Sequence, residues 1–265
     1  MNQDYIIADP WSLIEQGFNP KRVESSESLF SIGNGAFGQR ANFEENYSGD
    51  TFEGSYIAGV YYPDKTKVGW WKNGYPDYFA KVLNAPSWIG INVRINDEIL
   101  DLHTCLSVSG FRRELNMKEG WLSRSFKAVL KNGVEVFVSS LRFLSLDIDE
   151  LGAIRYKVTP LNSDATISFE PYLDASIKNK DSNWDDQFWE ITKIHRNSER
   201  SFIVAQTMKT AFKTCTFMQS NCFLNEQPLT LTSESVETNT TITDRYTQRV
   251  EKGTVFEIQK FGGYT

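Results

Sequence analysis

Residues 123–143, SRSFKAVLKNGVEVFVSSLRF, decide the fold class, because apolar and polar side chains alternate on both sides of an Asn-Gly pair. Apolar residues occupy every second position from 126 to 130 and again from 134 to 138. Successive side chains of a β-strand point to opposite faces, so this period of two predicts two half-buried strands. Asn132 and Gly133 both tolerate the positive φ of a type I′ turn. The stretch therefore predicts a β-hairpin closed by such a turn.

The same period recurs along most of the chain. In residues 89–95, Ile and Val alternate with Gly, Asn and Arg. Further strands are predicted at 152–160, 165–173, 188–195, 201–208, 213–220, 240–250 and 254–261. Helix is predicted only as short pieces at 9–17 and 77–84. So many strands without an intervening amphipathic helix predict an all-β fold, a large antiparallel β-sandwich, with residues 1–265 as one domain.

Charge and hydropathy exclude several partners. The net charge is −6, and no run of basic residues is present, so nucleic acid and anionic membrane surfaces are not expected to bind. The first residues show no cationic segment followed by an apolar one, and nowhere are about 18 consecutive residues apolar. We therefore expect a cytoplasmic protein that does not enter a membrane.

Cysteine and histidine are too sparse to suggest a disulfide framework or a metal site. The three cysteines, Cys105, Cys215 and Cys222, are expected to be buried free thiols. A pairing of Cys215 with Cys222 across a hairpin is the alternative. With two histidines and no Cys-x-x-Cys spacing, we expect no metal.

Residues 33–38, GNGAFG, match the G-x-G-x-x-G pattern of dinucleotide-binding folds. That pattern requires a strand before it and a helix of about 10 residues after it, because the pyrophosphate sits on the helix N-terminus. Here Asn42, Asn46, Gly49 and Gly54 interrupt any helical apolar face. The stretch is therefore interpreted as a turn between strands and not as a nucleotide site.

The longer string ESLFSIGNGAFGQRANFEE, residues 27–45, resembles the amino-terminal signature of glycoside hydrolase family 65, the maltose, trehalose and kojibiose phosphorylases and related hydrolases. Residues 53–62, 82–102 and 113–126 resemble later motifs of the same family in the same order. Asn116 departs from the aspartate usual in the last of them. The structural motif positions are Glu27, Phe30, Gly33, Asn34, Gly35, Gly38 and Arg40.

The resemblance implies a supersandwich fold similar to galactose mutarotase. It also implies that catalysis belongs to an (α/α)₆ barrel that would follow this domain and is absent from the chain. The full-length enzyme would be an inverting α-disaccharide phosphorylase, or a related hydrolase, with inorganic phosphate as co-substrate and no cofactor. No catalytic residue is transferred to this chain, which is expected to be inactive alone. Its expected partners are its own catalytic domain, the disaccharide and, as a homodimer, a second copy.

Residues 69–88, GWWKNGYPDYFAKVLNAPSW, combine aromatic rings with hydrogen-bonding groups, the mixture that sugars bind. The candidate sugar contacts are Trp70, Trp71, Asn73, Tyr75, Asp77 and Trp88. Packing in the core, or against the absent barrel, is the favoured alternative for these residues.

Two further hypotheses remain open. The chain could be a free-standing carbohydrate-binding module or lectin that uses this aromatic segment. It could also be a hydrolase using an acidic pair, Asp185 with Asp186 or Glu44 with Glu45, although we interpret these as solvated loop charges. Arg40 is expected to fix the glycine turn by bonding to Glu44 or Glu45.

Overall fold

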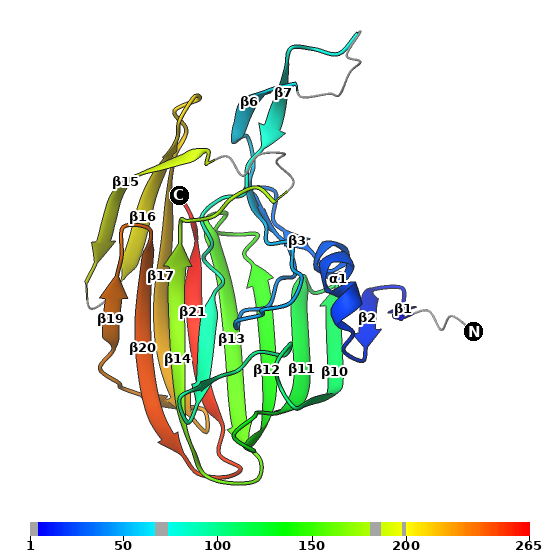
Figure 1. Ribbon diagram of the computed structural model, residues 1–265, viewed down its shortest axis with the longest axis vertical. Helices are drawn as coiled ribbons and strands as arrows, with labels where there is room; N and C mark the ends of the chain where they lie inside the picture. The colour runs from blue at the N-terminus through cyan, green and yellow to red at the C-terminus, as the bar shows by residue number, and fades with distance from the viewer. Residues whose placement is uncertain (1–4, 67–73, 181–186, 198–199) are drawn as a thin grey trace.

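The computed structural model describes residues 5–66, 74–180, 187–197 and 200–265, and it is the predicted antiparallel β-sandwich (Figure 1). The larger sheet has the order β1 (Ile6–Ala8), β2 (Ser12–Gln16), β10 (Ser107–Asn116), β11 (Trp121–Val129), β12 (Glu135–Leu144), β13 (Leu151–Pro160), β21 (Phe256–Tyr264), β17 (Lys213–Leu224), β16 (Ser201–Thr207) and β15 (Trp189–Arg196), with β18 (Gln227–Leu229) paired to β17. The smaller sheet has the order β19 (Glu234–Glu237), β20 (Thr241–Val250), β14 (Ala165–Asp174), β8 (Ile91–Ile95) and β9 (Glu98–Ile99).

The core lies between the inner faces of these two sheets. Ile91, Val93 and Ile95, which share one face of β8, are all completely buried. Phe169 of β14 stacks on Phe256 of β21 across the interface, with ring centroids 4.5 Å apart and planes at 26°. Every second residue of a strand therefore contributes to the core, as the alternating pattern predicted.

Trp88 is completely buried in this core, where its ring packs against two facing glycines of the larger sheet. Gly152 of β13 and Gly262 of β21 are register partners. A Cβ added to Gly152 would lie 2.5 Å from Trp88 Cη2, and one added to Gly262 would lie 2.8 Å from Trp88 Cε3. The absence of side chains at these positions therefore makes the space that the indole fills.

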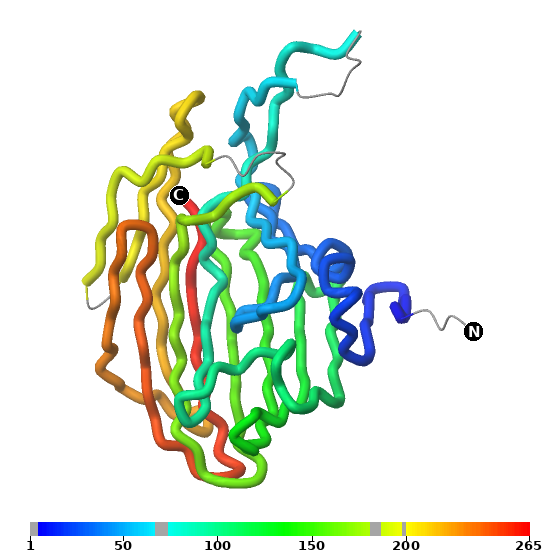
Figure 2. The backbone as a smooth tube through the Cα atoms, viewed as in Figure 1, coloured from blue at the N-terminus to red at the C-terminus, as the bar shows by residue number. Residues whose placement is uncertain are grey.

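Smaller elements lie outside the two main sheets. They are the 3-10 turn η1 (Pro20–Arg22), the helix α1 (Val23–Leu29), the sheet of β3 (Ile32–Gly33), β4 (Phe37–Gln39) and β5 (Ser55–Ile57), and the hairpin of β6 (Tyr61–Lys65) and β7 (Tyr78–Val82). The β6–β7 hairpin stands clear of the sandwich at the end where Thr265 also lies (Figures 1 and 2). No helix of the described residues is long and apolar enough to cross a membrane.

Both predicted helices are wrong. Residues 9–17 contain β2, which pairs with β10 so that Leu13 lies opposite Leu115. Residues 77–84 contain β7, whose register with β6 places Val82 opposite Tyr61. Pairing with a neighbouring strand outweighs local helix propensity in both segments.

The predicted type I′ turn at Asn132-Gly133 is also wrong. Only Gly133 has a positive φ, +81°, and its N–H donates to Leu130 O at 3.0 Å, which makes a type I turn followed by a glycine bulge. Positive φ at two successive positions occurs instead at Asn96-Asp97, between β8 and β9, and at Asn225-Glu226, between β17 and β18.

The cysteines are free thiols. Cys215 and Cys222 both lie on β17, so they do not face each other across a hairpin. Cys222 is buried, whereas Cys105 and Cys215 are partly buried.

Candidate functional site

The glycine-rich stretch forms a tight hairpin between β3 and β4, where Gly33 lies opposite Gly38. Gly35 alone of its glycines has a positive φ, +93°. The Asn34 amide oxygen accepts the N–H groups of Ala36 and Phe37, each at 3.0 Å. Its Nδ2 donates to Ser145 O at 2.8 Å, in the β12–β13 connection. Asn34 therefore closes the turn and also fastens it to the larger sheet.

Glu27 and Arg40 hold the segment that follows this hairpin. The buried Glu27 carboxylate accepts the Thr51 hydroxyl at 2.5 Å and the Phe52 N–H at 2.7 Å. Arg40 donates from Nε to Phe52 O at 2.7 Å and from Nη2 to Glu24 O at 3.1 Å. Arg40 thus bonds to backbone carbonyls, and the expected pairing with Glu44 or Glu45 is wrong.

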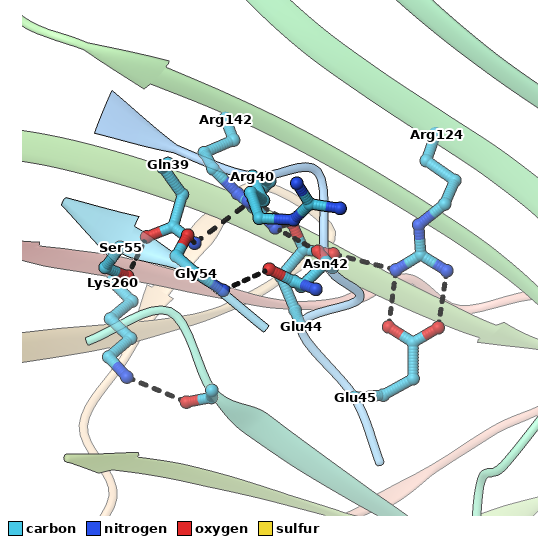
Figure 3. Close-up of polar contacts among 11 residues, drawn as sticks. Gln39, Arg40, Asn42, Glu44, Glu45, Gly54, Ser55, Arg124, Arg142 and Lys260 are labelled. Atoms are coloured by element: carbon cyan, nitrogen blue, oxygen red, sulfur yellow. Dashed lines mark hydrogen bonds and ion pairs between the residues drawn. The ribbon is translucent and has the colours of Figure 1, made fainter. Parts of the chain in front are cut away.

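Glu44 and Glu45 form a buried charge cluster with two arginines of the larger sheet (Figure 3). Arg124 of β11 donates to both oxygens of Glu45 at 2.5 Å and to Glu44 Oε2 at 2.7 Å. Arg142 of β12 donates to Glu44 Oε1 from Nη2 and, at 3.1 Å, from Nε. The expectation that this acidic pair is solvated is therefore wrong.

The cluster is suited to anchoring and unsuited to proton transfer. Burial raises the pKa of Glu44, but Arg142 and Arg124 outweigh burial and lower it to about 2. A carboxylate that stays ionised cannot serve as a general acid near neutral pH. The arginines therefore use these carboxylates to hold residues 42–45 against the sheet.

Lys260 of β21 is another buried basic side chain and has a different environment. Its Nζ donates to Gly90 O at 2.7 Å and to Tyr172 O at 2.8 Å, reaching from the larger sheet to the smaller one. Figure 3 shows the Lys260 side chain. Burial lowers the pKa of Lys260 well below its ordinary range. Lys260 thus ties the two sheets together through backbone carbonyls.

A chain of side-chain hydrogen bonds connects the glycine hairpin to the base of the β6–β7 hairpin. Ser55 Oγ donates to Gln39 Oε1 at 2.5 Å (Figure 3), and Ser55 N donates to Asn84 Oδ1 at 2.9 Å. Asn84 N donates in turn to Asn179 Oδ1 at 2.9 Å, and Trp189 Nε1 donates to Asn84 O at 2.8 Å. These buried amides therefore set the direction in which the hairpin leaves the sandwich.

We use the name projecting hairpin for residues 61–65 and 74–82. Its lower half contacts the β16–β17 connection, because Thr210 Oγ1 donates to Tyr61 O at 2.9 Å and Lys209 Nζ lies 4.6 Å from the Tyr62 ring centroid. Its upper half exposes aromatic rings, with 48% of Tyr75, 57% of Tyr78 and 45% of Phe79 accessible. The projecting hairpin therefore presents an aromatic surface at the end of the sandwich.

The candidate sugar contacts divide into three groups. Tyr75 and Asp77 lie exposed on the projecting hairpin, and Asp77 O accepts the Thr66 N–H at 2.8 Å. Trp88 lies in the core, which agrees with the packing alternative. Trp70, Trp71 and Asn73, like Asp185 and Asp186, lie outside the described residues. Sugar contact thus stays a prediction for the exposed part of the segment.

Metal-ion chemistry has no candidate within the described ranges, where no three His, Cys, Asp or Glu side chains come together.

Comparison with known proteins gives consistent matches. The family model described as "Glycosyl hydrolase family 65, N-terminal domain" matches residues 13–265. The chain is 44% identical to the maltose phosphorylase of Bacillus subtilis over 226 residues, which are 85% of this chain and 30% of the relative. It is 31% identical to the kojibiose phosphorylase of Escherichia coli over 64% of this chain and 20% of the relative.

A solved structure supports the fold. This protein from the human microbiome, provisionally named a kojibiose phosphorylase, is 23% identical and has a TM-score of 0.84 over 98% of this chain and 33% of that chain. The chain thus spans about a third or less of the length of the relatives it matches.

Proposed function

The chain belongs to glycosyl hydrolase family 65 as its amino-terminal domain, and from this membership we propose that it is the non-catalytic domain of an inverting α-disaccharide phosphorylase of the maltose type. The 44% identity to a maltose phosphorylase is the observation that carries this proposal. The buried acids agree with it, because Glu44 and Glu45 are both paired with arginines.

The reaction requires groups that we place in a separate catalytic domain. A carboxylic acid protonates the leaving glycosidic oxygen, while inorganic phosphate, already anionic, attacks the opposite face of the sugar. The products from maltose are β-glucose 1-phosphate and glucose. Phosphate is the co-substrate, and we propose no other cofactor.

The contribution of this chain is to shape the entrance to that site. The projecting hairpin leaves the sandwich at the end where Thr265 lies (Figure 1). Its Tyr75, Tyr78 and Phe79 are exposed. Aromatic rings with adjacent polar groups contact sugars and also pack at domain interfaces. We place these residues against the catalytic domain, next to its sugar site.

The proposal is tested by measuring phosphorolysis, with the 265-residue chain and the full-length protein assayed separately. We expect the full-length protein to release β-glucose 1-phosphate from maltose faster than from trehalose or kojibiose, and only when phosphate is present. The chain alone should release nothing. Glucose release by the chain alone would support the acidic-pair hydrolase instead, and phosphate-independent cleavage by the full-length protein would contradict phosphorolysis.

The role of the projecting hairpin is tested in the full-length enzyme. Tyr75→Ala should raise KM for maltose about tenfold, while Thr192→Ala, on the exposed side of β15, should leave KM within about twofold. If the isolated chain binds maltose and Tyr75→Ala abolishes this binding, the free-standing binding module is favoured.

A homodimer and a cytoplasmic location stay predictions. Light scattering of the full-length protein tests the homodimer.

A further inference from the structure

The larger sheet has a gap along one edge of β17. β16 pairs with β17 from Lys213 to Met218, and β18 pairs with it from Cys222 to Leu224. Between them, residues 219–221 have β21 on one side and, among the described strands, no neighbour on the other. This gap leaves a short stretch of strand edge uncovered.

A cavity of about 590 Å³ lies at this gap. Leu229, Leu231 and Tyr246, which pack on the core, form its apolar wall. The connection from β18 to β19 crosses it and contributes Thr230, Thr232 and Ser233. In Figure 1 this connection lies toward the end of the sandwich opposite the projecting hairpin. The cavity is therefore distinct from the surface proposed to meet the catalytic domain.

The ionic groups at the cavity compensate each other. Arg196 donates from Nε to Asp244 Oδ1 at 2.9 Å and from Nη2 to Ser233 Oγ at 3.1 Å. Ser235 donates its hydroxyl to the same Asp244 oxygen. The guanidinium and the carboxylate thus neutralise one another, so the cavity offers neither an unpaired cation to an anionic ligand nor an unpaired carboxylate to a cationic one.

One polar group in the cavity wall lacks a hydrogen-bond partner in the described parts of the chain. Ser220 Oγ is buried and makes no hydrogen bond within the part of the chain that the structure describes. A buried hydroxyl without a partner costs free energy, and buried polar groups are nearly always bonded to protein or to ordered water, so Ser220 Oγ requires a partner from outside the described residues. Ser220 lies in the uncovered stretch of β17, where the strand edge also faces the cavity.

We propose that this cavity binds a neutral saccharide of one or two sugar units. Hydroxyl groups, an aromatic ring and compensated charge match a ligand that is polyhydroxylated and uncharged. The volume falls in the range of about 300–1,000 Å³ that is typical of small-molecule sites. An uncovered edge of three residues is too short for a partner strand to pair, which argues against a peptide.

Titration of maltose into the ¹⁵N-labelled chain tests the proposal by mapping amide shifts. We expect shifts at Ser220, Thr230 and Ser233 that saturate with a single dissociation constant. Ser220→Ala should weaken maltose binding about fivefold, because it removes a hydrogen bond to the sugar. It should not lower the thermal midpoint, because that hydroxyl has no partner among the residues that the structure describes.

Matched controls separate this cavity from maltose binding elsewhere on the chain. The control is Ser109→Ala. Ser109 is exposed on β10, which lies in the other half of the larger sheet from β17, so this variant should bind maltose with unchanged affinity. Tyr246→Leu, which removes the aromatic ring from the cavity wall, should also weaken binding. Maltose shifts confined to the projecting hairpin, equal affinity in Ser220→Ala, or tighter binding of inorganic phosphate than of maltose would each overturn the proposal.

Discussion

Arg124 and Glu45 form a bidentate ion pair in the interior of the protein, with both N–O distances at 2.5 Å and side chains 4% and 0% exposed. The two residues are 79 positions apart, so the pair fixes the signature segment onto β11. Taking two charges out of water is costly, and the geometry compensates for that cost only while both partners are present.

Removing one partner should therefore destabilise the fold strongly. Arg124→Met leaves Glu45 without its counter-charge and Glu44 with Arg142 alone, and we expect a loss of about 3–5 kcal/mol in the free energy of unfolding. Urea unfolding monitored by tryptophan fluorescence measures it. The matched control is Lys180→Met, which breaks the exposed Lys180–Glu24 pair and should cost less than about 1 kcal/mol. Equal effects of the two changes would show that the buried cluster is not an anchor.

The same cluster should make stability depend on acid pH. Burial raises the pKa of Glu44, but the arginines lower it from its ordinary 4.5 to about 2. A carboxyl whose pKa is depressed by folding contributes its full stabilisation above pH 4.5 and loses it as the pH falls toward 2. The contribution amounts to about 3 kcal/mol.

The free energy of unfolding of the wild type minus that of Glu44→Gln isolates this contribution from other carboxyl groups. We expect the difference to be constant from neutral pH to about 4.5, and to shrink between there and pH 2. A difference that does not change over this interval would contradict the depressed pKa.

The sequence predicted the sandwich well and the charge cluster badly, for one physical reason. The alternation of apolar and polar residues lies within each strand's own sequence. It therefore predicted β8, β13 and β20 although the strands that pair with them were not known. The partners of Glu44 are 80 and 98 residues away, so nothing near it in sequence indicates burial. A usable signal did exist, because Arg124 and Arg142 occupy inward positions in alternating rows that are otherwise apolar apart from Ser140. Buried arginines at such positions require buried acids.

Lys260 should make the stability of the fold depend on pH at the alkaline side, whereas Glu44 does so at acid pH. Burial lowers the pKa of Lys260 well below its ordinary 10.5, so the unfolded chain holds a proton that the folded chain lacks in the interval between the two values. Stability then rises with pH through that interval. The free energy of unfolding of the wild type minus that of Lys260→Met should therefore increase as the pH rises toward about 10. A constant difference would mean that Lys260 stays charged in the folded protein.

Packing at Trp88 predicts that two glycines differ in their tolerance of a side chain, Gly152 in the core and Gly38 in the glycine hairpin. Gly152→Ala would place a Cβ 2.5 Å from Trp88 Cη2, inside a core that cannot expand freely, and we expect a loss of about 1–3 kcal/mol in the free energy of unfolding. Gly38, although part of the family signature, has no positive φ, and the nearest atom to an added Cβ is Ile32 O at 3.8 Å. Gly38→Ala should therefore change stability by less than about 1 kcal/mol. Urea unfolding of the two variants measures both effects. If Gly38→Ala is the more destabilising change, the requirement for glycine at that position comes from something other than space or backbone conformation in this domain, such as the approach of the catalytic domain.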